Sequence, residues 1–159
     1  IYLVMFHKRK YTPLNPEKYE GNPTNIIMRS SWETRFASWC DRSNHVLKWR
    51  SEETVVPYRS PVDNRLHRYF IDFTIKVKNK HDQIHTYLVE IKPKVQCSPP
   101  KFTGRRTKKY LAESKAYTVN AAKWKAAEQY ALDRGQKFII LTEDELGLTW
   151  KTGLDKKTK

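Results

Sequence analysis

The order of the secondary-structure patterns predicts one domain of the α/β class. An amphipathic helix comes first, two or three strands follow, and an alanine-rich helix and a last hydrophobic strand complete the order. The chain has 159 residues, of which 38% are hydrophobic and 13% aromatic. A chain of this length and composition can bury a real core. We see no internal repeat and no second domain.

The first helix is expected within residues 29–43, RSSWETRFASWCDRS. Its apolar side chains recur at helical spacing on one face, at Trp32, Phe36 and Trp39. Ser30 or Ser31 can cap the N-terminus. With Ser30 as the cap, Glu33 takes the third helical position, where its side chain can reach back to the backbone N–H of Ser30.

Several segments read as strands. Residues 45–59 hold β-branched and aromatic residues and are expected to form one or two short strands, and residues 60–64, SPVDN, form a turn. The segments 69–77 (YFIDFTIKV) and 87–94 (YLVEIKPK) are two strands joined by a short polar loop, and 137–142 (KFIILT) is a buried strand.

The second helix is expected over residues 117–134, with Gly135 as its C-terminal stop. Residues 1–25 are expected to form an irregular basic arm, because residues 8–25 hold three prolines and a glycine. Residues 26–150 then form the folded domain, and residues 151–159 form a basic, frayed tail.

Two of the strands carry an unusual set of charges, Asp72 on the first and Glu90 and Lys92 on the second. Strict alternation places Tyr69, Ile71, Phe73, Ile75 and Val77 on one face and Asp72 on the other. A hairpin symmetric about His81 sets Asp72 opposite Glu90, with Cβ atoms ~5 Å apart. Lys92 lies one step further along the face of Glu90.

Two carboxylates this close repel each other when both are charged, and a divalent cation between them removes the repulsion. A lysine beside them can activate a water or stabilise negative charge on a phosphate. The three residues therefore suit phosphodiester hydrolysis. The alternative is a structural salt bridge of Lys92 with Glu90 or Asp72 on the solvated face of a hairpin.

The charge balance points to a polyanionic partner. Thirty-one Lys and Arg face seventeen Asp and Glu, which gives a net charge of +14. Nucleic acid is the favoured partner and a membrane surface the weaker one, and a generically soluble basic protein remains the alternative. The two cysteines, Cys40 and Cys97, form no C-x-x-C pair. Neither a zinc site nor a disulfide framework is therefore expected. Two free thiols fit a reducing compartment.

The N-terminal residues carry no recognisable targeting sequence. No apolar run reaches the ~18 residues of a membrane span. The opening IYLVMF is too short for a signal-peptide core with its flanks. The chain begins with Ile1 rather than methionine, so residue 1 is not expected to be the natural start.

The ordered set of motifs resembles the PD-(D/E)xK nuclease superfamily. The motifs are Glu33 in SSWETRF, Asp72 in RYFIDF and Glu90-Ile91-Lys92 in LVEIKPK, followed by a helix and a strand. Residues 11–145 further resemble the head completion proteins of T-even-type tailed bacteriophages. The set is also similar to the endonuclease subunit of heteromeric bacterial transposases. That subunit has a further domain without counterpart here, so a role in transposition is less expected. Ile71 departs from the proline of the superfamily pattern.

The resemblance implies a restriction-endonuclease-like core, with a central mixed β-sheet flanked by helices in αβββαβ order. It implies Mg²⁺-dependent cleavage of DNA, with Mn²⁺ as a substitute. Asp72, Glu90 and the backbone carbonyl of Ile91 would be the metal ligands, Lys92 the catalytic lysine, and Glu33 a carboxylate that reaches the site from the helix. It also implies double-stranded DNA as substrate, phage head or portal-vertex proteins as partners, no membrane, and a location in the virion or the host cytoplasm.

Basic residues near the two strands are the expected DNA contacts. They are Arg68 before the Asp strand, and Lys94, Lys101, Arg105, Arg106, Lys108 and Lys109 after the catalytic strand. The alternative for residues 101–109 is a solvated loop. A second function therefore stays open, that of a non-catalytic basic structural or DNA-binding head protein on a nuclease fold. The clustered acids favour the enzyme, because acids weaken phosphate binding unless a cation is present.

Overall fold

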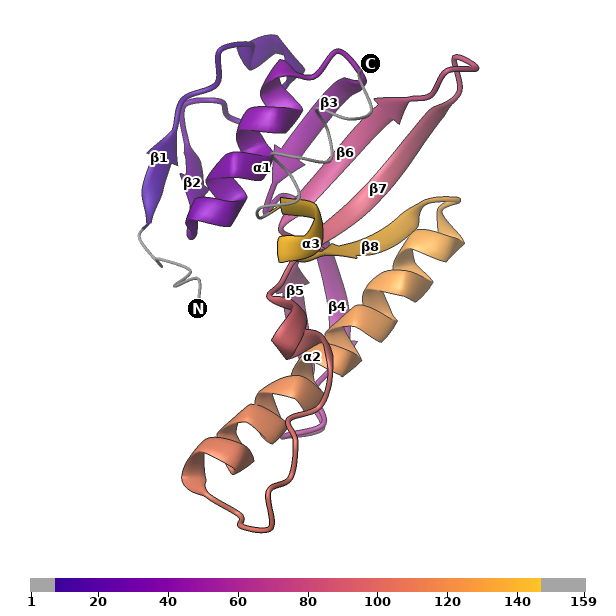
Figure 1. The fold of residues 1–159 in the computed structure, drawn as a ribbon. Coiled ribbons are helices and arrows are strands. Elements are labelled where there is room, and N and C mark those ends of the chain that lie inside the picture. The colour runs from indigo at the N-terminus through magenta and orange to yellow at the C-terminus, as the bar shows by residue number, and fades with distance from the viewer. Residues whose placement is uncertain (1–7, 147–159) are drawn as a thin grey trace.

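The structure, a computed structural model, describes residues 8–146 and is built around a four-stranded mixed sheet (Figure 1). The strand order is β3–β6–β7–β8, in which β7 and β8 are parallel and the other neighbours antiparallel. These strands span Val46–Ser51, Phe73–Lys78, Ile84–Ile91 and Lys137–Leu141. The predicted α/β class and mixed sheet are confirmed.

Helix α1, Ser31–Arg42, covers one face of the sheet. Its apolar face packs as the spacing predicts, since Phe36 is buried and Trp32 and Trp39 pack against the same core. Ser30 is the N-cap, and its hydroxyl accepts the N–H of Glu33 at 3.1 Å. The sheet contributes alternate residues to this core, including Phe73, Ile75, Val89 and Ile91.

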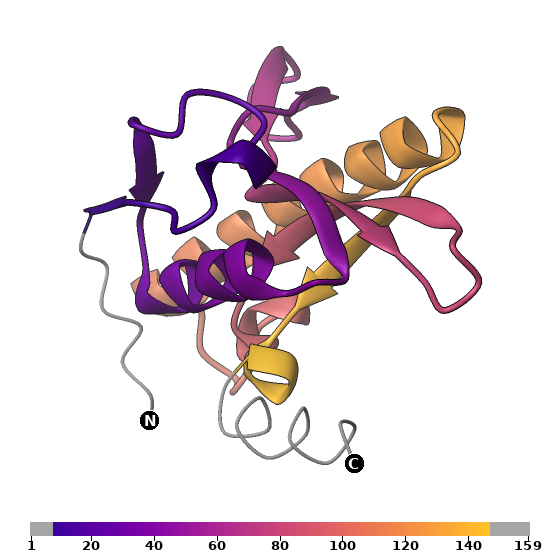
Figure 2. The same ribbon diagram turned by 90° about the horizontal axis from the view of Figure 1, so that it is seen from above.

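Helix α2, Lys108–Asp133, covers the opposite face and projects beyond the sheet (Figures 1 and 2). The helix begins nine residues before the predicted start at 117, because Thr107 caps it by accepting the N–H of Tyr110. Its end is as predicted. Gly135 has φ +65°, and the N–H groups of Gly135 and Gln136 donate to the carbonyls of Leu132 and Ala131 in a Schellman motif.

The strand predicted over residues 69–77 is broken at Ile71 and Asp72. β5, Leu66–Phe70, pairs with β4, Val55–Arg59, in a separate two-stranded ribbon that packs on α2. The predicted single face is therefore wrong: Tyr69 and Ile71 lie in the core under α2, whereas Phe73, Ile75 and Val77 face α1. The predicted turn at 60–64 joins β4 to β5.

The N-terminal arm is more ordered than its composition predicts. β1, Arg9–Tyr11, pairs with β2, Ile26–Met28, and a short 3₁₀ helix, η1, covers Pro16–Lys18. A second 3₁₀ helix, η2, spans Lys94–Cys97, and α3 spans Glu143–Leu146. The expected tail at 151–159 and the opening IYLVMF lie outside the described residues. No described helix is both long and apolar enough to span a bilayer.

A buried carboxylate explains the order of the arm. Asp41, at the end of α1, is 0% exposed and accepts the N–H groups of Leu14 and Asn15 at 2.7 and 2.9 Å. It also accepts the hydroxyl of Tyr11 at 3.1 Å, and burial beside this carboxylate raises the pKa of Tyr11 to about 12. Lys18 donates to the carbonyls of Cys40, Asp41 and Ser43, which are the last acceptors of the helix.

We expect Asp41→Ala to lower the free energy of unfolding by about 2–4 kcal/mol, because it leaves buried donors without an acceptor. Urea unfolding of the purified protein measures this difference. The matched control is Asp133→Ala, an exposed position at the end of α2, which should leave the transition midpoint unchanged. Equal midpoints for wild type and Asp41→Ala would contradict the structural role of Asp41.

Candidate active site

The break between β5 and β6 places Asp72 against the end of β7. In every β6–β7 pair the two residues lie equally far from His81 along the sequence. The pairs run from Phe73 with Val89 to Lys78 with Ile84, which is the predicted register. Asp72 comes directly before the first of these pairs. Its Oδ2 accepts the backbone N–H of Ile91 at 2.9 Å, which holds the half-buried carboxylate beside the Glu90–Lys92 segment.

Glu90 is buried, and both its carboxylate oxygens have partners. The hydroxyl of Tyr69 donates to Oε2 at 2.5 Å, and the ammonium of Lys92 lies 3.5 Å from Oε1. Tyr69 is itself buried, and Lys123 of α2 lies 5.5 Å from the centre of its ring. Glu90 and Lys92 thus lie close together, as predicted. Tyr69 is an additional partner of Glu90, which the sequence analysis did not predict because it treated residues 69–77 as one strand with Tyr69 and Asp72 on opposite faces.

Glu33 reaches the same region from the first turn of α1. Its Oε2 accepts the N–H of Arg29 at 2.9 Å, rather than the N–H of Ser30 that the capping-box pattern predicts. Burial raises the pKa of Glu33, and the carboxylates of Glu52 and Glu90 raise it further, while the Arg29 N–H opposes the shift. Glu33 is therefore near enough to Glu90 for the charge of Glu90 to affect its pKa.

Glu52 is a fourth carboxylate here that the sequence analysis missed. It follows β3 with φ +55°, and its N–H donates to the carbonyl of Asp72 at 3.2 Å. Its side chain forms an ion pair with Arg29 at 2.8 Å. No sequence motif identifies Glu52 as a site residue. Its position depends on a contact between two distant segments, the end of β3 and the break between β5 and β6.

The electrostatics of the cluster favour a bound cation. Burial raises the pKa of Asp72 well above its ordinary value, and the carboxylates of Glu90 and Glu33 raise it further. The Ile91 N–H and Lys92 act in the opposite direction. Within residues 8–146, no three Asp, Glu, His or Cys side chains form a metal cage by themselves. The donor set of Asp72 and Glu90 suits an ion such as Mg²⁺ that keeps several waters or phosphate oxygens.

The expected DNA contacts do not all lie in a loop. Lys101, Arg105 and Arg106 are exposed in the connection between η2 and α2, but Lys108 and Lys109 belong to the first turn of α2. Lys94 pairs with Asp144 at 2.9 Å, so part of its charge is already compensated. On β5, the guanidinium of Arg68 lies 5.5 Å from the ring of Phe70.

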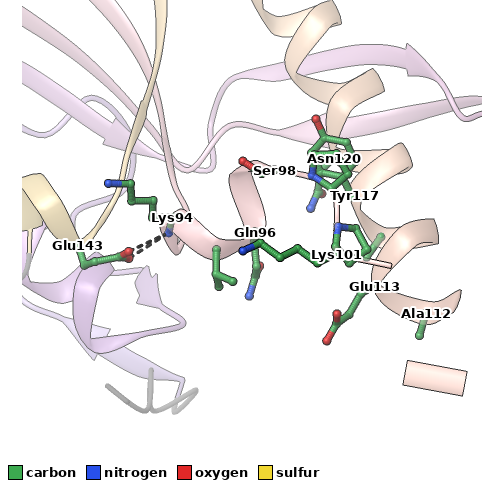
Figure 3. A pocket seen from close by; sticks show the side chains of 13 residues that line it. Lys94, Gln96, Ser98, Lys101, Ala112, Glu113, Tyr117, Asn120 and Glu143 are labelled. Atoms are coloured by element: carbon green, nitrogen blue, oxygen red, sulfur yellow. Dashed lines mark hydrogen bonds between the residues drawn. The ribbon is translucent and has the colours of Figure 1, made fainter. Parts of the chain in front are cut away.

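A surface depression lies beside these basic residues and away from Asp72 and Glu90. It has a volume of about 1060 Å³ and lies between η2, the connection and the first half of α2 (Figure 3). Lys94, Lys101, Tyr117 and Asn120 are among its lining residues. The hydrogen bonds that fix Asp72 and Glu90 mark the candidate site more strongly than this open depression does, because they orient the groups that can act chemically.

Comparisons with known proteins identify relatives of this chain. The profile of the family described as "TnsA-like endonuclease N terminal" matches residues 43–143, which include Asp72, Glu90 and Lys92. The head completion nuclease of Enterobacteria phage T4 is 38% identical over 146 residues, which cover 89% of this chain and 95% of the relative. No solved structure matches significantly. The chain therefore belongs to the family of TnsA-like endonuclease N-terminal domains.

Proposed function

We propose that this protein is a metal-dependent DNA endonuclease that acts in phage head completion. The observation that carries the proposal is the fixed set of Asp72, Glu90 and Lys92 at the end of β7, with hydrogen bonds and an ion pair on their charged groups. Membership of an endonuclease family and the printed name of the phage T4 relative support it.

Asp72, Glu90 and the backbone carbonyl of Ile91 would hold the Mg²⁺ ion, with Mn²⁺ as a substitute. The backbone N–H of Ile91 bonds to Oδ2 of Asp72, and the residue is only partly buried, which is compatible with ligation through its other oxygen. A bound Mg²⁺ supplies Lewis acidity at a phosphate oxygen and favours the deprotonated form of a water. The buried partners of Glu90 keep its carboxylate aimed while the substrate binds.

Lys92 is the proposed catalytic cation. Its ammonium stands 3.5 Å from Glu90, at the partly exposed end of the strand, where a phosphate can approach it. It can orient a water, or stabilise the charge that develops on the phosphate during cleavage. Glu33 approaches from the other face through the first turn of α1, and its raised pKa suits it to accept or hold a proton of that water.

The substrate of this function is double-stranded DNA, and head or portal-vertex proteins of the virion are the proposed partners. The net charge of +14 and the exposed residues Lys101, Arg105, Arg106 and Lys108 support a phosphate-binding surface. The alternative is a head protein that binds DNA on this fold without cutting it. Measurement of cleavage separates the two functions.

We expect the purified protein to nick plasmid DNA with Mg²⁺ or Mn²⁺ and to leave it intact with EDTA. Asp72→Asn keeps the size of the side chain but removes its charge, so it should lose Mn²⁺ binding and nicking together. The matched control is Asp82→Asn in the β6–β7 turn, which should nick like wild type. Nicking in EDTA would contradict the metal dependence, and intact plasmid over a range of metals and pH would contradict catalysis by this protein alone.

Lys92→Ala separates a catalytic lysine from a structural ion pair. We expect the rate of nicking to fall by ~100-fold or more, because one group that stabilises the transition state is lost. Folding and Mn²⁺ binding should persist, since Asp72 and Glu90 remain, and thermal melting and Mn²⁺ titration check this. Lys78→Ala is the control. Equal rates for wild type and Lys92→Ala would remove the lysine from the mechanism.

DNA affinity should fall steeply with salt, with a slope of about −0.9 in log K against log salt for each phosphate contact. Replacing Arg105 and Arg106 by alanine should make this slope shallower by the contribution of about two phosphate contacts. The charge-matched control replaces Lys78 at the end of β6 and Lys80 in the turn that follows, and it should keep the slope. If both double variants behave alike, the connection does not contact DNA.

A further inference from the structure

The β4–β5 ribbon has one covered face and one open face. Val56, Tyr58 and Tyr69 point to the covered face and pack with α2. Residues that pair across an antiparallel ladder share a face, so the open face is made of three pairs: Val55 with Phe70, Pro57 with Arg68, and Arg59 with Leu66. Leu66 is 67% exposed and Phe70 44% exposed, so both present apolar surface to the solvent.

The open face is basic as well as apolar. Residues 55–70 carry three arginines and one aspartate, and that aspartate, Asp63, pairs with His67 at 2.7 Å. The guanidinium of Arg68 lies over the ring of Phe70, and Arg59 donates to the carbonyl of Asn64 at 2.7 Å. These contacts order both arginines at the surface. A face with this chemistry fits an anionic partner that also offers apolar groups.

The ribbon leads directly to the candidate site. β5 ends at Phe70, two residues before Asp72, and the N–H of Ile71 donates to the carbonyl of Thr54 at 3.0 Å. This bond ties the base of the ribbon to the break that presents Asp72. In Figure 1 the ribbon extends beyond the sheet, and Figure 2 shows that it also diverges from the first half of α2, so a long polymer bound at Asp72 can continue along the ribbon.

The dimensions of the ribbon match one groove of DNA. Strands of five residues extend for roughly 17 Å, the length of about five base pairs. The major groove of B-DNA is about 12 Å wide and admits a two-stranded ribbon, whereas the minor groove is about 6 Å wide and admits one only when the DNA is deformed.

We propose that the open face of the β4–β5 ribbon enters the major groove of duplex DNA next to the phosphate at Asp72. The proposal rests on the proposed function, because it takes DNA as the substrate. Arg59 and Arg68 contact phosphates or guanine edges that face the groove, and Leu66 and Phe70 contact the methyl groups of thymines. The ribbon therefore determines how the duplex is oriented over the carboxylates.

The test measures binding without catalysis. Full-length protein in EDTA is titrated onto a short fluorescent duplex, onto the same duplex with bulky groups on thymine C5, and onto the duplex saturated with the minor-groove ligand netropsin. We expect the C5 groups to weaken binding by about tenfold and netropsin to have little effect. The variant Leu66→Ala/Arg68→Ala should bind the plain duplex about tenfold more weakly and lose its sensitivity to the C5 groups.

Leu132→Ala/Arg134→Ala, at the exposed end of α2, is the matched control and should bind like wild type. Thermal melting shows that each variant is folded. Wild-type binding that is indifferent to the C5 groups, or that netropsin abolishes, overturns the groove assignment. If nicking with Mn²⁺ persists in that case, the endonuclease function stands and only this inference fails. Absence of both nicking and duplex binding would instead remove the proposed function and the inference with it.

Discussion

The antiparallel register of β6 and β7 is the constraint on which the rest of the structure depends. A shift by one residue would turn Val89 and Ile91 out of the core under α1 and put the Glu90 carboxylate there instead. The turn between the strands opposes such a shift, because the Asn79 side chain accepts the N–H groups of His81 and Gln83. The same register brings Ile91 to Asp72. Core packing and the arrangement of the candidate site therefore have one common cause.

The carboxylates gather at one place on a strongly basic protein. Glu33 comes from α1 and Glu90 from β7, and burial together with the charges of these two carboxylates raises the pKa of Asp72. Hydrogen bonds from the Ile91 N–H and the Tyr69 hydroxyl hold the two strand carboxylates despite this repulsion. A cation that binds the folded state would relieve the repulsion and add to stability by mass action. Two neighbouring cations already pair with carboxylates of the cluster, Arg29 with Glu52 and Lys92 with Glu90.

The features that depend on local patterns were predictable from the sequence. The apolar face of α1, its Ser30 cap, the Gly135 stop, the hairpin register and the Glu90–Lys92 pair follow from residue spacing alone. The break at Asp72 was not predictable, because the alternation in YFIDFTIKV continues through it and the hydrogen bond that stabilises it comes from Ile91. Glu52 and Tyr69 enter the site through contacts between distant segments. The early start of α2 was missed because its first two turns are basic and lack an apolar face.

The connection between the strands also bears on the order in which the protein can fold. Asp72 and Ile91 are only 19 residues apart, on the two sides of one hairpin. Hairpins form in ~1–10 μs, whereas the parallel pairing of β7 with β8 must wait for the long crossover through α2. The two strand carboxylates can thus meet before the sheet is complete, while α1 delivers Glu33 only when it docks on the formed core. The short separation in sequence thus allows the carboxylates of Asp72 and Glu90 to come together without the rest of the domain.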